Sequence, residues 1–289
     1  YSNEGTPGFI TPSVPFAERR FINMHIEKIE LNDAAVLTVM LHTPTPKMAS
    51  TAATKRAAVI ICPGGAYEYC SERESDPPAV AFLEMGMQAL VLNYSTGMKA
   101  ANKRPLCEIA ETIKIVRENS EKWQIDVHKI AVCGFSAGGH LAASLAVHWN
   151  DPEILKRCHV QDARLLRPDA VILAYPVITT GKYANQASIA RVSRGSGDNL
   201  EYWSLEKQVQ THTPPVFLWH TMDDDGVPVE NSFLFARSLH QVGVECECHF
   251  FASGPHGMSI ATAEVDAASE NVHIWLRLCR NWLMEQFGR

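Results

Sequence analysis

The sequence predicts an α/β fold in which helices cover both faces of a mostly parallel sheet. From about residue 57 onward, short apolar stretches of strand length alternate with longer stretches whose apolar residues recur at helical spacing. Strand-like stretches such as residues 130–133 are apolar throughout, which is typical of strands buried on both faces. The chain has 289 residues, a length that one α/β domain can reach.

A hairpin opens the predicted sheet. Residues 24–31 and 35–42 have the composition of strands, and Asn32-Asp33-Ala34 between them is a turn of the hairpin type. The two strands therefore precede the region in which strands and helices alternate.

The later elements follow from apolar runs and helical spacing. The predicted strands are residues 57–62, 88–94, 129–133, 170–175, 216–220 and 244–251. The predicted helices are residues 77–85, 105–123, a stretch that begins at Ala137, 230–242 and 269–287. In the second helix Ile109, Ile113 and Val116 lie on one face, and Pro105 is near the first turn. The helix that begins at Ala137 is rich in small residues, as close packing onto a sheet requires.

The segment from Thr179 to Leu200 is a long region without clear periodicity. Segments of this kind are often binding loops or lids. No linker, internal repeat or low-complexity tract divides the chain. We therefore expect residues 1–289 to form a single domain with a short lid-like insertion around residues 179–200.

The charge pattern argues against nucleic acid and membranes as partners. The formal net charge is −6, from 26 Lys and Arg and 32 Asp and Glu residues, with both signs scattered along the chain. Nothing resembles the basic stripe that nucleic acid or anionic lipid requires, and no apolar run has the length of a membrane span. The first residues, from Tyr1 on, lack the hydrophobic region of a signal peptide.

The eight cysteines have positions typical of buried, reduced thiols. Cys62 and Cys133 end apolar strands, and Cys246 and Cys248 share one face of another strand. His249 points to the opposite face, because successive strand residues alternate, so we expect no metal site there. Reduced thiols and the missing signal-peptide pattern predict a cytoplasmic location.

Gly134-Phe135-Ser136-Ala137-Gly138 follows a predicted buried strand and opens a predicted helix. This is the setting of a nucleophile elbow, a sharp strand-to-helix turn that presents a serine. A serine hydroxyl is a weak nucleophile at neutral pH, so it needs a histidine to take its proton and backbone N–H groups to receive the oxyanion. The alternative interpretation is an ordinary glycine turn before a core helix. We interpret Ser136 as the candidate nucleophile.

An acid and a base are predicted in loops that follow later strands, because ligands of such sheets bind beyond the carboxyl ends of the strands. The strand at 216–220 leads into three aspartates, residues 223–225, and the strand at 244–251 leads into a constrained loop with His256. The order Ser, Asp, His is that of the α/β-hydrolases. The residues alone leave open which aspartate serves, since all three lie in one turn. His220 ends its strand and needs only local hydrogen bonds.

The stretch from Trp219 to Ser232 resembles the acid loop of α/β-hydrolase esterases related to acetyl-xylan and feruloyl esterases. In those proteins the acid lies three residues before a Val-Pro pair, which is Val227-Pro228 here. The resemblance implies that Asp224 is the acid, that Asp223 is a hydrogen-bonding neighbour and that Asp225 is exposed.

The resemblance extends to Ile61-Cys62-Pro63-Gly64-Gly65-Ala66-Tyr67 and to Ser71-Glu72-Arg73-Glu74. These stretches are similar to the family's oxyanion region, where a glycine-rich turn offers N–H donors to a tetrahedral intermediate. The resemblance implies an oxyanion hole formed by the backbone of Ala137 with Gly65 or Ala66. Pro63 stands where relatives of hormone-sensitive lipase have His, which moves the chain toward the carbohydrate esterases.

The family resemblance implies a serine carboxylic-ester hydrolase that acts without a cofactor or metal. Expected substrates are short acyl esters, above all acetyl groups on sugars or xylo-oligosaccharides. Relatives are sometimes named xylanases, but glycoside cleavage normally needs paired carboxylates beside a sugar cleft. Two other functions stay open: a peptidase of the prolyl-oligopeptidase type and a non-catalytic protein that has kept the fold. A homo-oligomer is compatible with the sequence, which is silent on oligomeric state.

Overall fold

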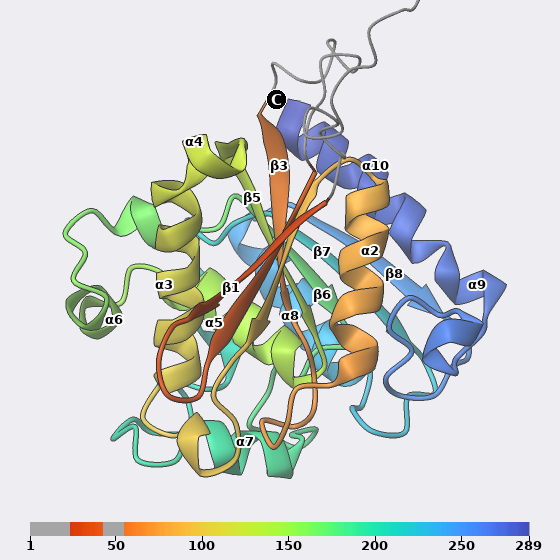
Figure 1. The fold of residues 1–289 in the computed structure, drawn as a ribbon. Coiled ribbons are helices and arrows are strands. Elements are labelled where there is room, and N and C mark those ends of the chain that lie inside the picture. Colours follow the sequence, from red (N-terminus) through yellow and green to blue (C-terminus); the bar gives the residue numbers. More distant parts are fainter. Residues whose placement is uncertain (1–23, 43–54, 289) are drawn as a thin grey trace, which may run out of the picture.

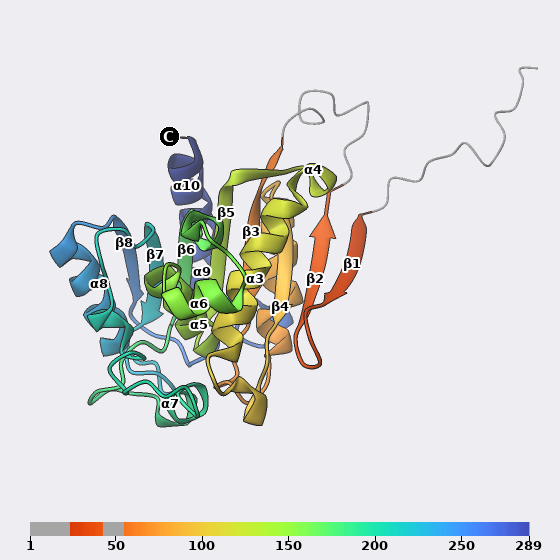
Figure 2. The same cartoon turned by 90° about the vertical axis from the view of Figure 1, so that its left-hand side faces the viewer.

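The structure, a computed structural model, describes residues 24–42 and 55–288; the ends of the expected domain lie outside these ranges. One eight-stranded sheet has the order β1-β2-β4-β3-β5-β6-β7-β8, which Figure 2 shows as a series. Antiparallel pairing joins β1 (His25–Glu30) to β2 (Val36–Leu41) and β2 to β4 (Gln88–Asn93). The other neighbours are parallel: β3 (Arg56–Cys62), β5 (Ile125–Phe135), β6 (Ala170–Ala174), β7 (Val216–Thr221) and β8 (Cys246–Phe251), with β4 beside β3. The predicted mostly parallel sheet is confirmed.

Helices cover both faces of this sheet (Figure 1). One face carries α2 (Asp76–Glu84), α9 (Glu270–His273) and α10 (Trp275–Gly288). The other carries α3 (Arg104–Glu118), α4 (Ser120–Trp123), α5 (Ala137–His148) and α8 (Glu230–Val242). Alternate residues of β3 enter the two cores: Val59 and Ile61 pack with the first set of helices, Ala58 and Ile60 with the second. Two short α-helices and five 3₁₀-helices complete the described elements: α6 (Pro152–Arg157), α7 (Gln186–Val192), η3 (Glu72–Glu74), η4 (Gly97–Ala100), η5 (Ala163–Leu166), η6 (Leu205–Lys207) and η7 (Ala263–Val265).

The structure divides two helices that the sequence predicts as continuous. The stretch 105–123 becomes α3 and α4, because Asn119 leaves helical geometry at φ −97° and ψ 9°. Its side-chain Nδ2 donates to the Ile115 carbonyl at 2.9 Å, which favours the end of α3 at this point. The last helix is likewise divided into α9 and α10 at Ile274.

The region 179–200 contains a short helix that periodicity did not reveal. Helix α7 begins after Asn185, whose side chain accepts a hydrogen bond from the Ser188 N–H at 3.1 Å. In Figure 1 this helix lies at the lower edge of the sheet, where the parallel strands end. The loops that carry the candidate residues leave the sheet at this same edge.

No helix within residues 24–42 and 55–288 combines the length and the apolar character that crossing a bilayer would need.

Candidate active site

Ser136 occupies the turn between β5 and α5 in a backbone conformation that residues other than glycine rarely adopt, with φ 52° and ψ −115°. Such a conformation costs about 1–3 kcal/mol and persists where the surroundings enforce it. Three backbone hydrogen bonds do so: the Ser136 N–H donates to Ala174 O at 3.0 Å, and its carbonyl accepts from His140 and Val177, each at 3.1 Å. The elbow geometry therefore presents the side chain at the start of α5.

The helix after the elbow packs directly on the end of β3. A Cβ added to Gly138 would lie 2.0 Å from the carbonyl oxygen of Cys62 and 2.4 Å from that of Pro63. Both obstacles are backbone atoms, so no side-chain movement could relieve the contact. The second glycine of the elbow motif is thus required for α5 to approach the loop that follows β3.

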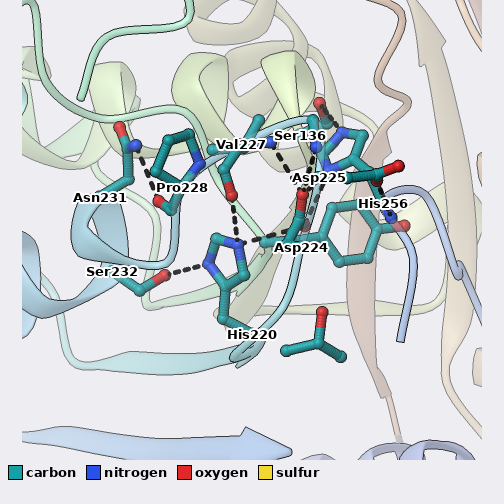
Figure 3. Close-up of polar contacts among 12 residues, drawn as sticks. Ser136, His220, Asp224, Asp225, Val227, Pro228, Asn231, Ser232 and His256 are labelled. Atoms are coloured by element: carbon teal, nitrogen blue, oxygen red, sulfur yellow. Dashed lines mark hydrogen bonds and ion pairs between the residues drawn. The ribbon is translucent and has the colours of Figure 1, made fainter. Parts of the chain in front are cut away.

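The structure brings the three predicted triad residues together (Figure 3). Ser136 Oγ lies 2.7 Å from His256 Nε2. His256 Nδ1 lies 2.8 Å from Oδ2 and 3.0 Å from Oδ1 of Asp224. A histidine between a hydroxyl and a carboxylate can take a proton from the first while the second fixes its tautomer.

The three neighbouring aspartates have different partners. Asp224 contacts the imidazole ring, and its side chain is only 1% exposed. Asp223 accepts from the Ser253 hydroxyl and the Gly254 N–H, both at 2.7 Å. Asp225 is exposed and accepts from the backbone N–H of His256 at 3.1 Å. The two outer aspartates therefore position the loop that carries His256.

Asp224 is buried yet held in its ionised form. Burial raises the pKa of its carboxyl, but hydrogen bonds from His220 and His256 outweigh this and leave the pKa well below its usual range. The backbone N–H groups of Gly226 and Val227 also donate to Oδ1, at 2.9 and 2.8 Å. Asp224 is therefore a preorganised carboxylate.

His220 is a residue of this site that the sequence did not identify. It is fully buried, and its Nε2 lies 3.0 Å from the Val227 carbonyl and 3.2 Å from Asp224 Oδ2 (Figure 3). Since a carbonyl only accepts, Nε2 carries the hydrogen, and Nδ1 accepts from the Ser232 hydroxyl at 2.7 Å. His220 thus makes the local hydrogen bonds expected of it and also contacts the acid, four residues further along the chain.

The predicted oxyanion loop has three successive residues with positive φ: Gly65 at 122°, Ala66 at 53° and Tyr67 at 58°. Their carbonyls are held by other groups, since Gly65 O accepts from Glu68 N–H at 2.8 Å and Tyr67 O from Gly97 N–H at 2.7 Å. Neither the Gly65 nor the Ala66 N–H donates to any described residue. Successive N–H groups in turns of this kind form anion-binding concavities.

The side chain of Tyr67 anchors this loop to the helix that follows Ser136. Its hydroxyl donates to His140 Nδ1 at 3.0 Å, and His140 Nε2 donates to the Trp203 carbonyl at 3.1 Å. Burial lowers the pKa of His140 to about 4, so the ring is neutral at pH 7. The predicted oxyanion loop and Ser136 are therefore attached to the same helix.

The profile of the BD-FAE family matches residues 46–239. The chain belongs to the BD-FAE family. Endo-1,4-beta-xylanase B of Butyrivibrio fibrisolvens is 40% identical over 216 residues, which cover 73% of this BD-FAE chain and 34% of that protein. The acetylxylan esterase of Xylanibacter ruminicola is 26% identical over 213 residues, covering 71% of this chain and 42% of that enzyme. The chain thus spans between a third and a half of the length of these two relatives.

Solved structures resemble this BD-FAE chain over nearly its whole length. MGS-M1, an α/β-hydrolase enzyme from a Medee basin deep-sea metagenome library, has a TM-score of 0.74 at 30% identity and covers 93% of this chain and 100% of its own. The acetyl ester-xyloside bifunctional hydrolase of Caldicellulosiruptor lactoaceticus has a TM-score of 0.76 at 30% identity, covering 94% and 99%. The α/β-hydrolase fold expected from the sequence is confirmed.

Proposed function

We propose that the protein is a serine carboxylic-ester hydrolase with Ser136 as nucleophile, His256 as general base and acid, and Asp224 as the orienting carboxylate. The observation that carries the proposal is the continuous hydrogen-bonded series from Ser136 Oγ through His256 to the buried Asp224. Membership of the BD-FAE family and the ester hydrolases among its relatives support it.

The proposed reaction has two acyl-transfer steps. Ser136 Oγ attacks the acyl carbon while His256 Nε2 takes the hydroxyl proton, and the same proton then leaves with the alcohol oxygen as the ester bond breaks. Water attacks the resulting acyl-enzyme, giving a proton to His256, which returns it to Ser136 as the acid departs. The N–H groups of Gly65 or Ala66 and of Ala137 would receive the oxyanion in both steps.

We propose short acyl groups on sugars, above all acetyl groups, as the substrate class. The relatives named acetylxylan esterase and acetyl ester-xyloside hydrolase support this class. The relative named as a xylanase matches this chain over only 34% of its own length, so its name does not by itself assign an activity to the shared part. Asp224 is fully engaged with His220 and His256, whereas glycoside cleavage needs two carboxylates that face the sugar.

The test compares hydrolysis of nitrophenyl acetate with that of a proline-linked nitroanilide. We expect the wild type to cleave the ester and Ser136→Ala to lose about 10⁴-fold or more in kcat, because only binding and oxyanion stabilisation remain. Ser120→Ala is a matched control, since Ser120 in α4 is as buried as Ser136, at 7% exposure. Cleavage of the nitroanilide alone would favour a peptidase. If neither compound is cleaved, the result would favour a non-catalytic protein. Retention of most esterase activity in Ser136→Ala would refute the nucleophile.

A further inference from the structure

Glu74 places a buried carboxyl group directly behind the oxyanion loop. It is the last residue of η3 and is 3% exposed. Its Oε2 accepts from the Gly64 N–H at 2.8 Å. Gly64 in turn touches the nucleophile, because a Cβ added to it would lie 2.9 Å from Ser136 Cβ and 2.6 Å from Glu74 Oε2. One glycine without a side chain therefore separates this carboxyl group from the elbow.

The other oxygen of Glu74 leads to the histidine. Oε1 accepts from the Tyr175 hydroxyl at 2.7 Å, and the same hydroxyl accepts from the Ser259 N–H at 2.8 Å. The Tyr175 ring meets the imidazole of His256 edge to face, with ring centroids 5.1 Å apart. Glu74 thus contacts both the loop before Ser136 and the aromatic ring against which His256 packs.

Arg73, the preceding residue, holds the loop that carries His256. Its Nη2 donates to the Gly257 carbonyl and its Nη1 to the Val265 carbonyl, both at 3.1 Å. The Ser259 hydroxyl donates back to the Arg73 carbonyl at 2.5 Å. Adjacent residues of one 3₁₀-helix therefore connect the oxyanion side of the site to the histidine side.

The hydrogen bonds of Glu74 fit an ionised carboxylate. Oε2 accepts from the Gly64 N–H, which can only donate, so a proton on Oε2 would have no acceptor there, and Oε1 accepts from the Tyr175 hydroxyl. Burial raises the pKa of this carboxyl above its ordinary value, and the hydrogen bonds from Tyr175 and Gly64 and the nearby charges of His256 and Arg73 limit the rise. Burial likewise raises the pKa of the other titratable neighbours, which keeps them neutral near pH 7: Tyr94, Tyr175, Cys133 and Cys70, the last to about 12.

We propose that Glu74 is a positioning residue of the ester-hydrolysis site, which fixes Gly64 and Tyr175 and presents a negative charge to the imidazolium that forms on His256. This inference rests on the proposed function. A buried carboxylate costs desolvation energy that an apolar side chain would not, so its presence here is better explained by activity than by stability. The titratable or charged groups that face His256 are Ser136, Asp224, Asp225, Tyr175, Glu74 and Arg73.

The test variant is Glu74→Gln, which keeps the shape and removes the charge. We expect kcat for nitrophenyl acetate to fall about 10- to 100-fold with KM within about twofold, because small displacements at the reacting centre slow catalysis to this extent. The acidic limb of the kcat/KM pH profile should move to lower pH, since the imidazolium loses a favourable neighbour. Glu74→Asp, which keeps the charge, should leave that limb in place and recover part of kcat.

Glu108→Gln is the matched control. Glu108 is also 3% exposed and accepts from the Ser95 N–H at 2.7 Å and from Asn32 Nδ2 at 2.8 Å. Loss of the Glu108 charge should lower the melting temperature without changing kcat or the pH profile of the folded protein. The inference is overturned if Glu74→Gln behaves in the same way, with activity reduced only in proportion to the folded fraction.

Labelling with a fluorophosphonate separates failure of this inference from failure of the proposed function. The reagent forms a bond between phosphorus and Ser136 Oγ and releases fluoride, and mass spectrometry gives the rate for any active serine irrespective of the natural ester. No labelling of Ser136 in the wild type would refute the proposed function. Normal labelling of the wild type with an equal rate in folded Glu74→Gln would refute the role of Glu74 alone. If Glu74→Gln does not fold, Tyr175→Phe, which removes one hydrogen bond of the carboxylate, should show the fall in labelling rate instead, and an unchanged rate would refute the role.

Discussion

The backbone of Ser136 illustrates how single residues make this site. Its φ of 52° costs about 1–3 kcal/mol, and three hydrogen bonds to its own peptide groups, each contributing about 1 kcal/mol, offset that cost. Two of them come from the end of β6 and the loop after it: Ala174, the last residue of β6, accepts from its N–H, and Val177 donates to its carbonyl. Ser136, the proposed nucleophile, is therefore held by the neighbouring strand as well as by its own helix.

Asp224 is the aspartate whose charge we expect to matter for catalysis. Asp224→Asn should reduce kcat by about 10³- to 10⁴-fold, because an amide in this position favours the wrong imidazole tautomer. Asp223→Asn and Asp225→Asn retain acceptor oxygens for the backbone of the histidine loop and should cost far less. Steady-state kinetics of the three variants with nitrophenyl acetate measure the difference, and greatest sensitivity at position 223 or 225 would assign the acid to that residue instead.

The sequence predicts those residues of this site that lie in a recognisable motif or at a defined position after a strand. The elbow motif marks Ser136, and loop position after a strand marks His256, whereas the choice among the three aspartates came from the family resemblance. His220 has no such local mark, and Glu74, although part of a stretch that resembles the family's oxyanion region, has nothing in the sequence that assigns it a role. His220 reaches Asp224 only because the chain turns back at the end of β7, and Glu74 reaches Tyr175 across 101 positions of sequence.

At the scale of elements, the segment that contains α7 connects two loops of the site. Arg191 Nη1 donates to the Ala66 carbonyl at 3.3 Å, in the oxyanion loop. Asn185 Nδ2 donates to the Gly226 carbonyl at 3.2 Å, in the acid loop. The segment is also attached to α8, because Asn231 Nδ2 donates to the Tyr183 carbonyl at 2.9 Å. The region expected to be lid-like is thus hydrogen-bonded to both loops of the site and to α8.

This attachment leads to a prediction on acyl length. With α7 held over the oxyanion loop, the acyl pocket should be small, so kcat/KM for nitrophenyl esters should be greatest at acetate or propionate and fall steeply beyond butyrate. A roomy apolar pocket would instead gain about 0.8 kcal/mol per buried methylene, roughly fourfold in kcat/KM for each one. Measured kcat/KM values that rise from acetate to octanoate would contradict the short-acyl assignment and leave the triad unaffected.

Elements with strong periodicity were predicted to within a few residues, and those without it were not. Helix α8, at Glu230–Val242, has the predicted bounds. Helices α6 and α7 were not predicted, because six or seven residues contain too few turns for a helical apolar face to be recognised. Each begins after a capping side chain, Asp151 or Asn185, and these caps are visible only once the backbone geometry is known.

At the scale of the whole molecule, two neutral histidines make stability depend on pH. Burial lowers the pKa of His140 and of His148 to about 4 each, below the ordinary value of 6.5. Between these values the unfolded chain binds more protons than the folded one, so the free energy of unfolding should fall as pH drops from about 6.5 toward 4. The slope should reach about 1.4 kcal/mol per pH unit for each histidine.

Urea unfolding at pH 7.0 and 5.5 measures this dependence. His148→Gln removes one of the two titrating rings and should reduce the slope, although the variant loses the stack of His148 on Tyr202, whose ring centroids are 4.0 Å apart. His128→Gln is the control, because His128 is exposed and should leave the slope unchanged. Equal unfolding free energies at the two pH values in the wild type would contradict the assignment of both histidines as neutral.

The hydrogen bonds of Tyr183, Asn185 and Arg191 to α8, the acid loop and the oxyanion loop also bear on how new specificity could be introduced into this scaffold. Grafting the segment from a relative would replace Arg191 and Asn185, which donate to the Ala66 and Gly226 carbonyls, and would reposition the Tyr183 carbonyl that accepts from Asn231. A transplanted segment would therefore remove one hydrogen bond from the oxyanion loop and one from the acid loop, and turnover would suffer before selectivity changed. The unit to exchange between relatives is therefore the segment together with the oxyanion loop and the acid loop, with all three taken from the same protein.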